Sequence, residues 1–192
     1  MVKNKVKFIK FWECKPEEDN DYQIIRLGEK IQLPTCYLFH VYGDIEADLC
    51  FLTEIGGIGN WAAYIEDDFL YAGFASNVII YDLNNKNLIN NIHCKEWIHN
   101  FFKLDNGFLL HQEMSVKFFN KNLDLLWEDT SCVNIFGNLV LKENYEIGKD
   151  YIAIIDWYGF KHYYNKNGQF KMEKTEFDSG RIVGSTPNCI VF

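Results

Sequence analysis

The chain has 192 residues, of which 48% are hydrophobic and 24% are charged, so it has the composition of a globular protein with a substantial core. Its formal net charge of −8 at pH 7 argues against nucleic acid as a partner, because phosphate binding depends on clustered Lys and Arg. No apolar run is long enough to cross a membrane, and residues 1–10 lack the apolar core of a signal peptide. We therefore expect one soluble, cytoplasmic domain over residues 1–192, with no membrane association.

The N-terminal region, residues 1–59, is expected to be a less regular β region. Apolar runs at 5–14, 24–33, 35–42 and 49–52 predict strands, and charged or Pro-containing segments between them predict loops. Aromatic residues make up 17% of the chain and favour strands throughout. This region matches the rest of the chain poorly, so it is either a degenerate repeat or a separate edge layer.

Residues 60–174 contain the same short pattern three times. Each copy is a pair of apolar strands, the second of which ends in an aromatic residue followed by Asp or Asn. A polar turn and a third strand come next. The aromatic residues are Tyr81, Phe119 and Tyr164, and they lie roughly 40 residues apart, the period of propeller blades built from four short strands.

The strand pairs, the aromatic residue with its Asp or Asn, and the Asn- and Lys-rich turns resemble blades of the WD40-like and quinoprotein-like β-propeller families. The Gly-His and Trp-Asp signatures do not occur at the expected places. The resemblance implies an all-β fold of antiparallel four-stranded meander units, a small or incomplete propeller of at most four blades. A β-sandwich is the alternative. Residues 94–102 are the best candidate for a short helical turn, although Trp97, Phe101 and Phe102 would fit a strand equally well.

Few residues suggest catalysis or metal binding. His93, Cys94 and His99 are close in sequence, and a Cys with a nearby His could supply a nucleophile and its base. Three further histidines, one on each of three predicted hairpins, could line a metal channel, although the polar face of a sheet is the simpler interpretation: His40, His111 and His162. The sequence lacks the H-E-x-x-H, G-x-S-x-G and EF-hand motifs. We predict no catalytic residues, no enzymatic activity, no cofactor and no bound metal.

The six cysteines are dispersed along the chain and include no C-x-x-C pair. In a chain of this size that pattern is typical of reduced, buried thiols in a cytosolic protein. The sequence therefore predicts six free thiols and no structural zinc.

Carboxylates are grouped in predicted loops between strands. A charge run is often only a solvated face, but loops of successive hairpins that emerge on one rim would form a single negative patch with aromatic anchors. The residues that we assign to such a partner-binding surface are Glu66, Asp67, Asp68, Asp44, Glu46, Asp48, Glu128, Asp129, Trp61, Trp127 and Trp157. A basic protein is the partner that this surface would favour.

In size, acidity and lack of catalytic motifs, the chain resembles bacterial immunity proteins, which bind and neutralise a cognate toxin, often a basic nuclease. The resemblance implies a non-enzymatic protein-binding module that blocks a basic toxin domain. The alternative is a small β-propeller or β-sandwich hydrolase that uses Asp, Glu and His side chains from its loops.

Overall fold

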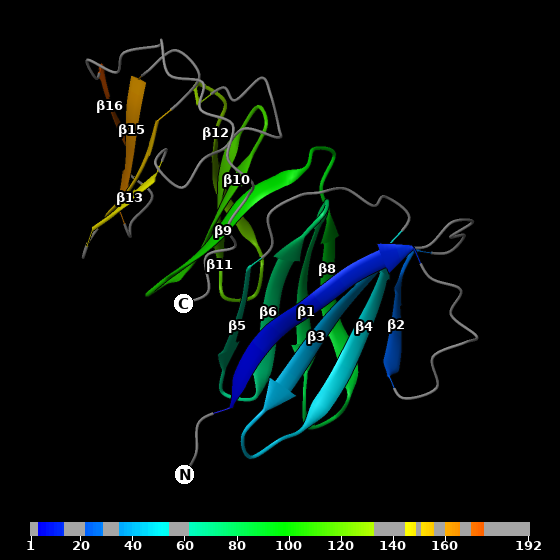
Figure 1. The fold of residues 1–192 in the computed structure, drawn as a ribbon. Helices are drawn as coiled ribbons and strands as arrows, with labels where there is room; N and C mark the ends of the chain where they lie inside the picture. Colours follow the sequence, from blue (N-terminus) through cyan, green and yellow to red (C-terminus); the bar gives the residue numbers. More distant parts are fainter. Residues whose placement is uncertain are drawn as a thin grey trace. The chain divides into compact units, whose positions relative to one another are not determined.

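The computed structural model describes residues 4–13, 22–28, 35–53, 62–132, 145–148, 151–155, 160–165 and 170–174. All regular secondary structure in these residues is β-strand, and the strands form four sheets of four, which we call sheets A to D (Figure 1). By its internal contacts the chain divides into two compact units, residues 1–95 with sheets A and B, and residues 96–190 with sheets C and D. The single domain over residues 1–192 stays a prediction. Within the described part of the chain, no helix is long and apolar enough to span a membrane.

The two sheets of unit 1 are built as follows. Sheet A contains β1 (Lys5–Glu13), β2 (Gln23–Leu27), β3 (Thr35–Tyr42) and β4 (Ala47–Thr53), in the order β1-β3-β4-β2. Sheet B contains β5 (Ala62–Glu66), β6 (Phe69–Phe74), β7 (Asn77–Asp82) and β8 (Asn87–His93), in chain order. Sheet B is an antiparallel meander, whereas sheet A is mixed because β2 pairs parallel with β4.

The two sheets of unit 2 are both antiparallel meanders. Sheet C contains β9 (Ile98–Leu104), β10 (Gly107–Gln112), β11 (Val116–Asn120) and β12 (Leu125–Asp129). Sheet D contains β13 (Tyr145–Ile147), β14 (Tyr151–Ile155), β15 (Phe160–Asn165) and β16 (Phe170–Lys174). The expected fold class, all-β with four-stranded antiparallel, propeller-like units, is confirmed.

The helical turn expected over residues 94–102 is wrong, because Ile98–Leu104 form strand β9. Five consecutive residues from Ile98 to Phe102 are buried, so both faces of this strand are covered. β9 is nevertheless an edge strand of sheet C, and its mixed run of apolar and polar residues does not separate a strand from a helix in the sequence.

The repeated aromatic residues occupy equivalent positions. Each lies on the third strand of its sheet and is buried, and each is paired with the second residue of the preceding strand. The pairs are Tyr81 with Leu70, Phe119 with Phe108, and Tyr164 with Ile152. The repeated sequence pattern therefore corresponds to one sheet per copy.

The polar residue after the aromatic one has a local role in the turn. Asp82 Oδ1 accepts hydrogen bonds from the backbone N–H groups of Asn84 and Asn85, both at 2.9 Å. Asn120 Oδ1 likewise accepts hydrogen bonds from the backbone N–H groups of Asn122 and Asp124, also at 2.9 Å. Such Asx turns satisfy the backbone donors where a strand ends, which explains why Asp or Asn follows the aromatic residue.

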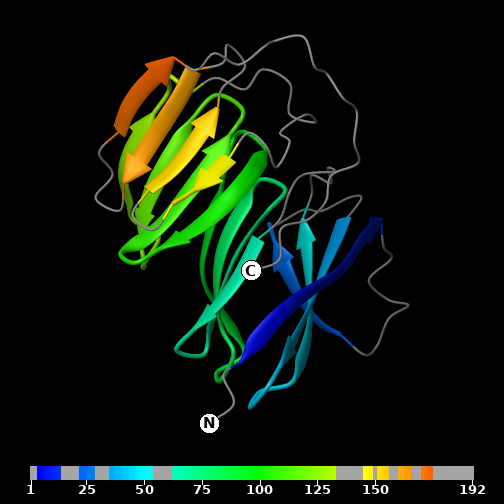
Figure 2. The ribbon, with the colours of Figure 1, turned by 60° about the vertical axis from the view of Figure 1, so that its left-hand side comes forward.

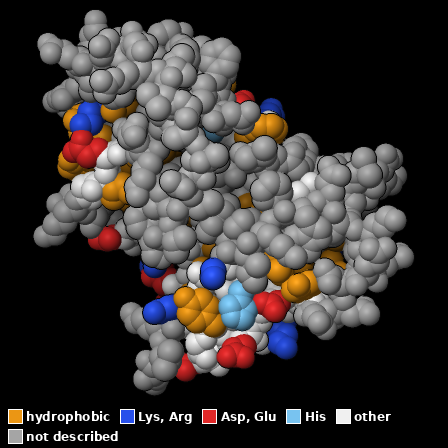
Figure 3. Space-filling model, in the orientation of Figure 1, with side chains coloured by type: hydrophobic (Ala, Val, Ile, Leu, Met, Phe, Trp, Pro, Cys, Tyr) orange, Lys and Arg blue, Asp and Glu red, His pale blue; other side chains and the backbone are white. Residues whose placement is uncertain are grey.

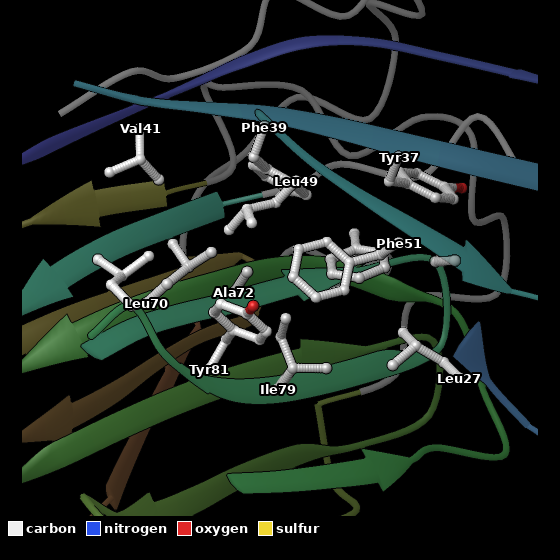
Figure 4. Close-up of a cluster of buried hydrophobic side chains, with 13 residues drawn as sticks. Leu27, Tyr37, Phe39, Val41, Leu49, Phe51, Leu70, Ala72, Ile79 and Tyr81 are labelled. Carbon is white, nitrogen blue, oxygen red and sulfur yellow. The ribbon is translucent and has the colours of Figure 1, made fainter. Parts of the chain in front are cut away.

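Sheets A and B pack face to face through a hydrophobic core. Figure 4 shows Phe39 and Phe51 of sheet A opposite Ala72 and Tyr81 of sheet B. The Phe51 ring meets the Tyr81 ring edge-on at 6.0 Å between centroids. Fully burying one such side chain contributes about 1.5–3 kcal/mol to the free energy of folding. The core therefore fixes sheets A and B against each other, and with them the turns at their ends.

Sheets C and D pack in the same way within unit 2, as Figure 2 shows for the yellow and orange strands of sheet D and the green strands of sheet C. Phe118 and Trp127 of sheet C stack at 5.8 Å, and Trp127 stacks in turn on Tyr164 of sheet D at 5.6 Å. Tyr164 therefore lies in the contact between the two sheets, much as Tyr81 does in unit 1.

The cysteines require a correction. Cys50, Cys94 and Cys132 are buried free thiols, but Cys36 on β3 is disulfide-bonded, with a partner outside the described residues. The prediction of six free thiols is therefore wrong, because sequence spacing does not reveal which remote cysteines fold together. Since disulfides persist in oxidising compartments, the cysteines no longer support a cytoplasmic location.

Candidate functional site

Three turns of unit 1 meet at one end of sheets A and B. Asn4 joins two of them: its side-chain N–H donates to Asp68 Oδ1, and its Oδ1 accepts from the backbone N–H of Ile45, both at 2.8 Å. Asp68 joins the third, since its backbone carbonyl accepts from Leu83 N–H at 3.0 Å and its Oδ2 accepts from Asn84 at 3.2 Å. The turns after β3, β5 and β7 are thus tied together.

This end carries carboxylates that lie far apart in the sequence. We call the following six residues the acidic rim: Asp44, Glu46, Asp48, Glu66, Asp67 and Asp68. Residues 1–95 contain nine Lys and Arg against fourteen Asp and Glu, so the unit that bears the rim is itself acidic. The local field therefore has the sign needed to attract a cationic surface.

The rim residues differ in what they can offer to a partner. Asp44, Glu46 and Asp67 are exposed at the turns. Asp68 is committed to the hydrogen bonds that hold the turns together, and Glu66 is half-buried. The first three carboxylates are therefore the accessible ones.

The β5–β6 turn explains two of the rim residues structurally. Asp67 and Asp68 have φ angles of 49° and 62°, in the left-handed region that most residues avoid. A two-residue hairpin turn of this kind favours Gly, Asn or Asp at both positions. The Asp-Asp sequence therefore forms the turn and at the same time projects charge from it.

Two residues beside the rim were not assigned to the surface from the sequence. His40 Nδ1 lies 2.7 Å from Asp48 Oδ1, and the His40 ring stacks on the Tyr42 ring with centroids 5.7 Å apart. Tyr42 is 40% exposed. In Figure 3 the lower end shows a histidine and an apolar ring among red and blue side chains. The alternation at the end of β3, which places His40 and Tyr42 on one face, is the signal that could have identified them.

The remaining predicted surface residues lie in unit 2 or outside the described residues. Glu128 is exposed and pairs with Lys117 at 3.3 Å. Trp61 and Trp157 fall outside the described residues. Trp127 is half-buried between Phe118 and Tyr164, so it is a packing residue rather than an exposed anchor.

Asp129 is also interior, contrary to its assignment to the surface. Its Oδ2 accepts from Tyr164 O–H at 2.7 Å, and its Oδ1 accepts from the Ser131 backbone N–H and hydroxyl at 2.8 and 2.6 Å. Only 9% of the residue is exposed. These hydrogen bonds satisfy a buried carboxylate, so Asp129 stabilises the contact between sheets C and D.

The histidines considered for a metal channel are not together as a set. His40 lies on sheet A, whereas His111 and His162 are buried in unit 2 near His99. Among the described residues, no group of three or more His, Cys, Asp or Glu side chains is placed to hold a metal ion. His93 is exposed and Cys94 is buried.

No protein-family model and no curated protein sequence matches this chain. Among solved structures, BamB from Moraxella catarrhalis is similar with a TM-score of 0.48 and 16% identity, over 74% of this chain and 47% of that one. Hsv2 from Kluyveromyces marxianus has a TM-score of 0.46 and 9% identity, over 73% and 45%. BBS1N, solved in complex with ARL6DN, has a TM-score of 0.44 and 10% identity, over 75% and 50%. The chain spans about half the length of these structures, and its propeller-like description rests on the strand order and register given above.

Proposed function

We propose that this protein is a non-enzymatic protein-binding module that binds a basic partner protein through the acidic rim of unit 1. The observation that carries the proposal is the pair of hydrogen bonds made by Asn4, which join the turn of Asp44 and Glu46 to the turn of Asp67 and Asp68. Because of this link, carboxylates from separate hairpins act on a partner as one surface.

The chemistry of the rim favours Arg and Lys on the partner. The exposed carboxylates of Asp44, Glu46 and Asp67 accept hydrogen bonds from cationic side chains. The exposed Tyr42 ring, held by its stack on His40, offers a face for a cation–π contact. Exposed charges of this kind accelerate association and select the partner more than they add affinity.

The more specific form of the proposal is that the partner is a positively charged toxin domain, and that this chain is an immunity protein that occludes its active site. The acidity of the chain and its lack of catalytic motifs support this form. A bacterial cytoplasmic location belongs to this form of the proposal.

Affinity capture with matched variants tests the proposal. The rim variant, Asp44→Asn with Glu46→Gln and Asp67→Asn, removes three accessible charges while retaining side-chain size, and Asn tolerates the left-handed backbone at position 67. The control variant, Asp105→Asn with Glu113→Gln and Asp124→Asn, removes three charges from unit 2. We expect the wild type and the control to capture the same basic protein from the native cell, and the rim variant to lose it.

Three results would refute parts of the proposal. Equal capture by the rim variant would show that the rim is not the binding surface. If the captured protein is basic but the chain does not protect growing cells against it on co-expression, the immunity form is wrong and the binding module stands. Turnover of a substrate by the isolated chain would favour the hydrolase alternative.

A further inference from the structure

Three histidines lie in the interior of unit 2. His99 on β9, His111 on β10 and His162 on β15 are 2%, 0% and 0% exposed. The rings of His99 and His111 are 5.3 Å apart between centroids. His99 and His111 lie on paired strands of sheet C and His162 lies on sheet D, so His111, which is close to both of the others, lies at the contact between the two sheets.

The groups around the histidines are mostly neutral. His111 Nδ1 lies 2.6 Å from the hydroxyl of Tyr145 on β13. His162 Nδ1 lies 4.0 Å from Asp129 Oδ2, the carboxylate oxygen that also accepts from Tyr164. Cys132, a fully buried free thiol, is a further ionisable group at this contact among the residues that the structure describes.

His99 and His111 are therefore suited to the neutral state only. His99 Nε2 is buried and has no hydrogen-bond partner, so a proton there would be a buried donor without an acceptor. Burial lowers the pKa of His99 to about 4. Burial also holds the pKa of His111 well below its ordinary value, and the nearby His99 and His162 lower this pKa further. Two imidazolium rings at this separation would repel each other in a poorly solvated interior.

We propose that the His99–His111 pair is a pH-sensitive switch that keeps sheet D packed on sheet C at neutral pH and releases this contact when the two rings take up protons. The described histidines of unit 1 are placed differently. His40 is half-buried and faces Asp48, and His93 is exposed, so neither ring lies in the hydrophobic core of its unit. Unit 2 is therefore the acid-labile unit.

The direction of the effect follows from proton uptake. In the packed state sheet D covers sheet C, and in the opened state this contact is released. An exposed histidine has a pKa of about 6.5, so below that pH the opened state binds protons that the packed state excludes. The equilibrium constant for opening then rises about tenfold per pH unit for each excluded proton, until the pKa of the packed state is reached. At pH 5 the increase is roughly 30-fold for one histidine and roughly 1,000-fold for both.

Hydrogen exchange resolved by peptide, corrected for intrinsic exchange rates, measures opening of each sheet between pH 7.5 and 5. We expect the opening constant of sheets C and D to rise by the factors above and that of sheets A and B to change much less. The double variant His99→Phe with His111→Gln should lose this pH dependence, and the exposed-site control His93→Gln should retain it. Equal pH dependence in the double variant and the wild type would overturn the proposal.

A second measurement remains decisive if the double variant fails to fold at pH 7.5. The single variant His99→Phe keeps an aromatic ring beside His111. In this variant the logarithm of the opening constant of sheets C and D should change half as much with pH as in the wild type. In the wild type, the NMR signals of the His99 and His111 rings should show no titration in the packed state between pH 7.5 and 5. Ordinary titration near pH 6.5 with sheet D still protected would show that the rings accept protons in place, and would refute the switch.

Discussion

The Asp129–Tyr164 hydrogen bond gives the sharpest stability prediction, because a single atom can be removed from a buried contact between two sheets. Tyr164→Phe deletes the hydroxyl that donates to Asp129 Oδ2 at 2.7 Å. The ring itself stays, so the stack on Trp127 at 5.6 Å is preserved and no large cavity forms. The variant therefore separates the hydrogen bonds of the hydroxyl, to Asp129 and to Cys132, from the packing of the ring.

The expected loss follows from the charge and burial of the acceptor. A hydrogen bond to a charged group contributes about 1.5–3 kcal/mol, and among the described residues Asp129 would retain the two hydrogen bonds from Ser131. We expect unit 2 to lose about 1.5–3 kcal/mol at pH 7. Tyr163→Phe is the matched control on the same strand. Because Tyr163 is half-buried, this variant should lower the free energy of unfolding by no more than about 0.5 kcal/mol.

Urea unfolding followed by tryptophan fluorescence and circular dichroism measures both variants. Because the chain contains two compact units, the transition of unit 2 should be assigned by its coincidence with peptide-resolved hydrogen exchange. A Tyr164→Phe variant as stable as wild type, or a Tyr163→Phe variant equally destabilised, would refute this assignment of Asp129 to the sheet C–sheet D contact.

Two further predictions follow from the turns and the cysteines. Asn120→Ala removes the side-chain acceptor for two backbone N–H groups and should destabilise unit 2 by about 1 kcal/mol in thermal unfolding. Asn122→Ala, at an exposed position of the same turn, should destabilise it less. Equal destabilisation by the two variants would contradict the Asx-turn role of Asn120. Under denaturing, non-reducing conditions an alkylating reagent should label Cys50, Cys94 and Cys132 but leave Cys36 unlabelled until reductant is added, as read by mass spectrometry of peptides. Labelling of Cys36 without reductant would contradict the disulfide.

The sequence pattern identified the repeated sheets because short-range features define them. The aromatic residues Tyr81, Phe119 and Tyr164 recur with the polar turn residue that each hairpin needs, and both features are local. The predicted helical turn at residues 94–102 failed because its apolar positions, 97, 98, 101 and 102, fit the spacing of a helix as well as they fit a strand.

The surface was predicted less well, since its geometry depends on contacts between remote residues. The Asn4–Asp68 hydrogen bond that joins the acidic turns spans 64 residues, and no spacing rule indicates it. Glu128 and Asp129 read as one charge run, although the alternation of strand β12 turns the first outward and the second inward. His99, His111 and His162 form no motif: the first two meet because strands β9 and β10 pair, and His162 comes near them from sheet D.

The association rate with the captured basic partner tests the central claim most directly. Raising the ionic strength from 0.01 to 0.1 M shortens the Debye length from about 30 to about 10 Å, so steering by the rim should weaken. We predict that the association rate constants of the wild type and of the control variant (Asp105, Glu113 and Asp124) fall steeply, and to the same extent, as salt is raised. The rim variant (Asp44, Glu46 and Asp67) should have a low association rate constant at low salt that changes little as salt is raised. If both variants slow equally, net charge rather than the acidic rim controls association, and if neither slows, the partner binds elsewhere; either result would contradict the account.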